Sequence, residues 1–259
     1  MKKVIYKLIK KMGYSLSRIN PNKPGVFPDI KDAEFWGIYK SCSAFTMTSV
    51  ERMYALYSSV NYVLSNGIKG SFVECGVWRG GSAMLIAKML INRNCTDRKI
   101  YLYDTFEGMP APSGNDINLN GVDASEILRQ GEPDLKDPAW CIANLADVQA
   151  NMRSTNFPLE NIVYIKGKVE ETIPGNMPDA NIALLRLDTD WYESTRHELI
   201  YLFPRLELNG IIIIDDYGHW EGCKKAVDDY LKEHKINILL NRVDYTCRVG
   251  IKTSNIPFK

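Results

Sequence analysis

The sequence has almost no net charge and no long apolar run. Its 259 residues carry 32 Lys and Arg against 31 Asp and Glu, a formal net charge of +1. A nucleic-acid groove built on a strong basic field is therefore not indicated. No apolar stretch approaches the length of a membrane span, and the first residues are too basic for a secretory signal. These absences favour one sizeable globular domain that acts on a small molecule or a glycan.

Paired cysteines are also missing. The six cysteines include no C-x-x-C pair, and several lie within apolar segments. Neither a zinc site nor a disulfide framework is indicated, and reduced thiols are typical of a cytoplasmic protein. We therefore expect a cytoplasmic location, with peripheral contact at the inner membrane face left open by the N-terminal segment.

The N-terminal segment is basic and amphipathic. Residues 1–14 read MKKVIYKLIKKMGY, in which five apolar residues fall on one helical face and five lysines surround them. Two interpretations stay open: a helix that contacts an anionic membrane or a partner, and a terminal helix packed on its own domain. Proline and glycine then break the pattern. We expect this helix over residues 1–20 and a helical lid over residues 21–69.

From residue 70 to residue 259 the pattern alternates between strands and helices. Helical patterns such as Ser82–Ile91 and Thr195–Leu206 separate the strands, which is typical of a parallel sheet covered on both faces. The C-terminal INILLNRVDYTCRVGIK instead predicts an antiparallel pair. The expected fold is α/β, a mostly parallel seven-stranded sheet with a C-terminal antiparallel hairpin, and this outline resembles a Rossmann-like class I methyltransferase. The predicted parallel strands are Ser71–Cys75, Ile100–Asp104, Ile162–Ile165, Ile182–Leu187 and Gly210–Asp215.

One connection is much longer than the others. More than fifty residues separate Asp104 from Ile162, and they are rich in Gly, Pro, Asn and Asp. Long irregular insertions usually form lids or other functional segments. Open α/β sheets bind ligands at the carboxyl ends of their strands. We therefore expect the insertion, at about residues 108–158, to lie beside the binding site.

The first strand leads into a glycine turn with the features of a cofactor site. The segment SFVECGVWRGGSAMLIA ends its strand at Glu74 and then supplies Gly76 and Gly80. Glycines allow close approach of a ligand to the backbone, and a helix start favours negative charge. The spacing is not G-x-G-x-x-G, which disfavours a dinucleotide oxidoreductase. An acid at Glu74 suits the positively charged groups of S-adenosylmethionine, and Asp104 ends the next strand, where acids commonly bind ribose hydroxyls.

Each of these acids also fits a simpler role, as a helix cap or a solvated loop acid. A lone tryptophan such as Trp140 is a candidate to stack on adenine, although it is more often part of a core. The predicted cofactor-binding residues are Glu74, Gly76, Gly80, Ser82, Asp104, Thr105 and Trp140.

Four aspartates lie at the ends of the fourth and fifth predicted strands. Neighbouring strand ends lie close together, so these carboxylates converge, and without partners they repel one another. A divalent cation removes the repulsion, and all-oxygen ligands suit Mg²⁺, Mn²⁺ or Ca²⁺. Two alternatives stay open: a helix cap by Asp216, and neutralisation by Arg186 or Arg196. The four aspartates are Asp188, Asp190, Asp215 and Asp216.

Proton removal from an acceptor has several candidate groups. His219 follows the second acid pair and has a suitable intrinsic pKa for a base. Asp188 and Asp190 are the other candidates, and His219 equally fits a role in orienting a metal ligand.

These motifs together resemble the macrocin O-methyltransferase (TylF-type) family, from about Phe45 to the C-terminus. The resemblance implies an enzyme that uses S-adenosylmethionine and Mg²⁺ (or Mn²⁺) to methylate a sugar hydroxyl of a glycoside or surface-glycan precursor. It also implies that Asp188, Asp215 and Asp216 hold the metal, and that homo-oligomers form. The segments that carry it are MTSVERMYAL, VECGVWRGGSA, YDTFEGMP, LRLDTDWYESTRHEL and LFPRLELNGIIIIDDYGHWEGCKKAVDDYL.

Two other functions share part of this pattern. A metal-dependent methyltransferase of a catechol-like diol uses the same chemistry, and only the acceptor pocket separates it from a sugar enzyme. A methyltransferase-like scaffold that only binds a glycan is disfavoured by the intact acid cluster. The basic N-terminal helix favours a cell-surface glycan as the acceptor over a soluble antibiotic.

Overall fold

The computed structural model describes residues 27–131 and 139–254. The predicted basic helix at residues 1–20 lies outside the described residues. No helix within the described ranges is long and apolar enough to cross a membrane. The helices are α2 (Ala33–Cys42), α3 (Val50–Ser65), α4 (Gly81–Asn92), α5 (Ala124–Gln130), α6 (Leu145–Arg153), α7 (Val169–Thr172), α8 (Tyr192–Tyr201) and α9 (Glu221–Glu233). The strands are β1 (Ser71–Cys75), β2 (Ile100–Asp104), β3 (Ile162–Lys166), β4 (Ile182–Leu187), β5 (Leu206–Ile214), β6 (Asn241–Arg242) and β7 (Arg248–Ile251).

The strands form one seven-stranded sheet in the order β3-β2-β1-β4-β5-β7-β6. The first five are parallel, and β7 runs antiparallel to β5 and β6. The predicted α/β class I methyltransferase fold is confirmed. Three strands have their predicted bounds, and β5 ends at Ile214, so that Asp215 is the first residue beyond it.

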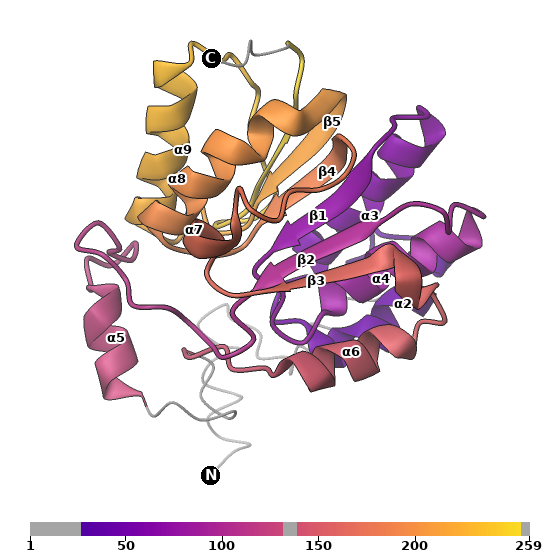
Figure 1. Ribbon diagram of the computed structural model, residues 1–259, viewed down its shortest axis with the longest axis horizontal. Coiled ribbons are helices and arrows are strands. Elements are labelled where there is room, and N and C mark those ends of the chain that lie inside the picture. Colours follow the sequence, from indigo (N-terminus) through magenta and orange to yellow (C-terminus); the bar gives the residue numbers. More distant parts are fainter. Residues whose placement is uncertain (1–26, 132–138, 255–259) are drawn as a thin grey trace, which may run out of the picture.

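The two faces of the sheet bury separate apolar clusters. Successive residues of a strand point to opposite faces, so Phe72 packs in one cluster and Val73 in the other. Figure 1 shows α2, α3, α4 and α6 on one face of the sheet and α7, α8 and α9 on the other. Every residue of β1 and β4 is buried, which explains why their apolar residues fall on both faces of the sheet without alternation.

The helices differ from the prediction in two respects, the bounds of one helix and the helical content of the insertion. The predicted helix Thr195–Leu206 is instead α8, which begins at Tyr192 and ends at Tyr201 before a 3₁₀ turn that contains Pro204. The long insertion is less irregular than predicted, because it contains α5 and α6. Helix α6 buries Val148 and Met152, and these side chains face Gly80 at the start of α4.

Candidate functional site

A cavity of about 300 Å³ lies at the carboxyl ends of β1, β2, β4 and β5. Its walls include six segments that are far apart in the sequence. The segments are Phe45–Thr48 before α3, the β1–α4 turn, residues 104–110 after β2, the two acid-bearing loops after β4 and β5, and Tyr245–Thr246 from the β6–β7 turn. This is the edge at which open α/β sheets bind ligands.

The turn after β1 is held by one half-buried acid and by close packing. Asp104 accepts hydrogen bonds from the backbone N–H groups of Val77 (2.6 Å) and Trp78 (3.1 Å). Gly76 has a φ of +82°, and a Cβ there would lie 2.0 Å from the carbonyl oxygen of Asp188. Burial raises the pKa of Asp104, while these N–H groups oppose the shift. Asp104 therefore fixes the turn and still faces the cavity.

The seven predicted cofactor residues divide into two groups. Four of them line the cavity: Gly76, Ser82, Asp104 and Thr105. The other three do not, although they lie around it. Gly80 faces α6, and Trp140 packs against the apolar cluster beneath α8 and α9, so its stacking on adenine remains a prediction.

Glu74 lies below the cavity floor. Its side chain is buried, and Oε1 accepts a hydrogen bond of 2.7 Å from Nη1 of Arg186. Burial raises the pKa of Glu74 to about 7 against the opposing charge of Arg186. Its place in this structure is thus to anchor a guanidinium, and its predicted contact with a cofactor remains a prediction.

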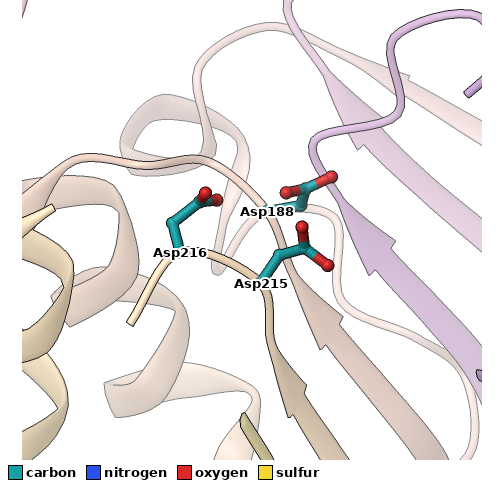
Figure 2. Close-up of side chains that lie close together, drawn as sticks. All are labelled: Asp188, Asp215 and Asp216. Carbon is teal, nitrogen blue, oxygen red and sulfur yellow. The ribbon is translucent and has the colours of Figure 1, made fainter. Parts of the chain in front are cut away.

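Three of the predicted acids meet at the ends of β4 and β5. Asp188, Asp215 and Asp216 each offer one carboxylate oxygen, and these oxygens lie within 4.8 Å of one another. Figure 2 shows the three side chains gathered around one space, Asp188 from β4 and the other two from β5. Asp190 lines the same cavity and has a φ of +66°, a strained conformation for a residue other than glycine.

Arg186 lies beneath this cluster and is only 3% exposed. Its Nη1 lies 2.7 Å from Oδ2 of Asp188, and its Nη2 donates to Oδ1 of Asp215 at 2.8 Å. The alternative that Arg186 neutralises an acid is therefore correct for part of the cluster. Arg196, the other candidate, pairs with Glu233 on the outer face.

A second arginine was not identified from the sequence. Arg52 of α3 pairs with Oδ2 of Asp215, and its Nε lies 3.2 Å from Asp244 of the β6–β7 turn. Burial alone would raise the pKa of Asp215, but Arg186 and Arg52 outweigh it and lower the pKa. Arg52 lies in a plain amphipathic helix far from the acids in sequence, so no local pattern marks it.

The site holds more carboxylates than arginines, and a bound metal ion would neutralise the excess negative charge. Desolvation raises the pKa of Asp188 and Asp216 well above the usual range, and neighbouring carboxylates raise it further. Oδ2 of Asp216 is buried and has no hydrogen-bond partner among the described residues. Asp216 does not cap α9, whose N-cap is Trp220. The oxygen ligands and the surplus of negative charge fit Mg²⁺ or Mn²⁺.

His219 lies on the cavity wall beyond the acids. Its Nδ1 is 3.3 Å from the hydroxyl of Tyr245, and its backbone N–H donates to the carbonyl of Asp216. Desolvation and the charge of Arg52 lower its pKa, which favours the neutral imidazole. The structure thus brings His219 to the site as the sequence predicts, on the outer side of the acid cluster.

The sequence and fold of the chain match those of known proteins. Residues 31–250 match the Macrocin-O-methyltransferase (TylF) family. The chain belongs to this family. It is an S-adenosylmethionine-dependent O-methyltransferase, as the resemblance in its motifs implies.

Several known proteins are similar to this chain in sequence or in structure. It is 32% identical over 246 residues to 8-demethyl-8-(2,3-dimethoxy-alpha-L-rhamnosyl)-tetracenomycin-C 4'-O-methyltransferase of Streptomyces olivaceus, covering 95% of this chain and 88% of that protein. It is 31% identical over 201 residues to mycinamicin III 3''-O-methyltransferase of Micromonospora griseorubida, covering 78% and 76%. The O-methyltransferase NovP superposes with a TM-score of 0.70 at 29% identity, covering 81% of this chain and 83% of that one.

Proposed function

We propose that this enzyme methylates a sugar hydroxyl, with a divalent metal held by Asp188, Asp215 and Asp216. The observation that carries the proposal is the meeting of these carboxylates in the wall of the cofactor cavity, where one oxygen of Asp216 is buried without a partner. The tetracenomycin relative, whose name specifies a rhamnosyl compound, supports a sugar acceptor. The mycinamicin III relative is by its name a 3''-O-methyltransferase.

The residues of the site divide the work of the reaction. A bound Mg²⁺ or Mn²⁺ would supply Lewis acidity that lowers the pKa of a sugar hydroxyl. Arg186 and Arg52 keep Asp215 ionised and hold its two oxygens in place. Gly76 and Asp104 place the cofactor turn directly beside the acid cluster. Much of the rate is expected to come from this positioning of two bound reactants.

Asp190 is the proposed general base. Its carboxylate lines the cavity next to the acid cluster, and the strained backbone at φ +66° directs it there. Desolvation raises its pKa to about 7, a value suited to proton removal at neutral pH. Asp188 is committed to the metal and to Arg186, and His219 is turned towards Tyr245.

We therefore expect Asp190→Asn to lower kcat by about 10²- to 10⁴-fold, the usual contribution of a general base. His219→Gln should lower kcat by no more than about 10- to 100-fold, because it loses only a supporting contact. The measurement is initial-rate formation of S-adenosylhomocysteine with both variants at saturating acceptor. A larger loss for His219→Gln than for Asp190→Asn would assign the proton removal to the imidazole.

The acceptor class is tested by a panel of diols. We expect methyl transfer to glycosides and nucleotide sugars with adjacent free hydroxyls, including rhamnosides and lipid-linked sugars, and at least about tenfold lower kcat/KM for catechols. Mass spectrometry of the products identifies the methylated oxygen. Preferential methylation of catechols would favour a methyltransferase of catechol-like diols over one of sugars. Failure to bind S-adenosylmethionine would favour a scaffold that only binds a glycan.

A further inference from the structure

Helices α8 and α9 begin without caps of their own. Their N-cap residues are Trp191 and Trp220, and neither side chain caps its helix. The first N–H groups of a helix have no partner within the helix and need an external acceptor. Both helices start at the end of an acid-bearing loop, so the position of each start sets the position of the residues before it.

The long insertion supplies the missing acceptors. Oδ1 of Asp116 accepts a hydrogen bond of 2.7 Å from the N–H of Tyr192, the first residue of α8. The carbonyl of Ile117, the next residue, accepts a bond of 2.8 Å from the N–H of Glu221, the first residue of α9. Two adjacent residues of the insertion thus cap the two helices that follow the acid clusters.

Asp116 is built into this junction. Its side chain is 0% exposed, and Oδ2 accepts from the backbone N–H (2.6 Å) and the hydroxyl (2.8 Å) of Ser113. A Cβ on Gly222 of α9 would lie 2.0 Å from Oδ1 of Asp116. The junction therefore requires both a carboxylate at Asp116 and a glycine at Gly222.

Three further contacts join the same stretch of the insertion to the site. The N–H of Leu119 donates to the carbonyl of His219 at 2.8 Å, and Asn118 forms an isolated β-bridge with Trp220. The indole N–H of Trp191, next to Asp190, donates to the carbonyl of Pro110 at 3.0 Å. The insertion is thus hydrogen-bonded to both loops that carry the proposed chemistry.

We infer that Asp116 is a positioning residue of the methyl-transfer site, which couples the insertion to the loops that hold Asp190 and Asp216. This inference rests on the proposed function for its effect on the reaction. The carboxylate does not reach the reacting atoms; it fixes where α8 and α9 begin, and so fixes the acids that precede them. The cofactor turn at Gly76 lies outside this junction and is not expected to depend on it.

The test compares Asp116→Ala and Asp116→Asn with the control Asp123→Ala. Asp123 lies in the same insertion, but its carboxylate accepts from Ser125 at the start of α5. Asp116→Ala should lower kcat/KM for an accepted glycoside by about 10²-fold, because small misplacements of reacting groups have effects of this size. Its affinity for S-adenosylhomocysteine should stay within threefold of wild type by calorimetry. Asp116→Asn, which keeps one acceptor oxygen, should fall between Asp116→Ala and wild type.

Hydrogen exchange tests the junction without any acceptor. Peptides that contain Tyr192 and Glu221 should exchange at least tenfold faster in Asp116→Ala, and at the wild-type rate in Asp123→Ala. Gly222→Ala should act like Asp116→Ala, and the double variant should lose less than the sum of the two, because both act through one contact.

Each outcome decides the inference. Unchanged hydrogen exchange at Tyr192 and Glu221 in Asp116→Ala overturns the inference. This result holds independently of the proposed function, because it does not require that the wild-type protein methylates a tested glycoside. Faster exchange with unchanged kcat/KM overturns the positioning role. A parallel loss of cofactor affinity and turnover would indicate a general structural role in its place.

Discussion

Asp216→Asn is expected to lower kcat/KM by at least about 10³-fold, because a ligand of the catalytic metal and several kcal/mol of charge stabilisation are lost. Affinity for S-adenosylhomocysteine should stay within threefold of wild type. Asparagine has the shape of aspartate, so the packing at the end of β5 is kept. The buried Oδ2 has no hydrogen-bond partner among the described residues, so the proposed cation would supply the partner that this oxygen lacks.

Asp215 is a less informative position for this test. Both of its oxygens accept from arginines, so its removal takes one carboxylate partner from each of two guanidinium groups near the core, and effects on folding and on catalysis would not be separable. The matched control for Asp216→Asn is Asp229→Asn. Asp229 is a surface acid of α9 that pairs with Lys225. This control variant should retain wild-type turnover. Wild-type turnover in Asp216→Asn would remove Asp216 from the metal site.

Arg186→Met is expected to destabilise the fold by about 3–5 kcal/mol, the usual effect of breaking a buried ion pair. The substitution removes the only described partner of Oε1 of Glu74 and one partner each of Asp188 and Asp215. The remaining carboxylates are then buried with too little positive charge and take up protons or water. Urea unfolding followed by far-ultraviolet circular dichroism measures the change, and methyl transfer should be lost as well.

The control for this substitution is Lys99→Met. Lys99 forms an ion pair with Asp179 on the surface, where water and salt screen the charges. Its unfolding midpoint should match that of wild type. If Arg186→Met also unfolds at the wild-type midpoint, the buried ion network does not stabilise the fold in the way described here.

The strands and the acid cluster could be predicted because their signals are local. Segments such as Ile211–Ile214 are apolar without alternation, which indicates a strand buried on both faces. Acids that directly follow such strands are delivered to one edge of the sheet by the parallel topology. The convergence of Asp188, Asp215 and Asp216 follows from those two facts.

Other parts of the site depend on contacts between distant segments. Arg52 reaches Asp215 from a helix that has no unusual residues, and the caps of α8 and α9 come from Asp116 and Ile117 in a stretch without periodicity. Propensity and spacing carry no information about such partners. Trp140 shows that a residue type suited to a binding site need not line it, since its side chain lies against the core rather than in the cavity.

Glu74 illustrates how one observation can support two roles. A carboxylate at the end of the first strand suits a positively charged cofactor, and it equally suits a buried arginine on the neighbouring strand. The contact with the arginine follows from the strand register, because Glu74 and Arg186 are paired residues of β1 and β4. The register of a parallel pair is set by tertiary packing and is not readable from either strand alone.

The most direct test of the metal-dependent mechanism is a titration of metal-free enzyme with Mg²⁺. Wild-type protein treated with EDTA and desalted should bind S-adenosylhomocysteine normally by calorimetry but transfer no methyl group to a glycoside that the untreated enzyme accepts. Added Mg²⁺ should restore turnover in wild type, and the same concentration should leave Asp216→Asn inactive. Full turnover of the wild-type enzyme without any divalent cation would contradict the account.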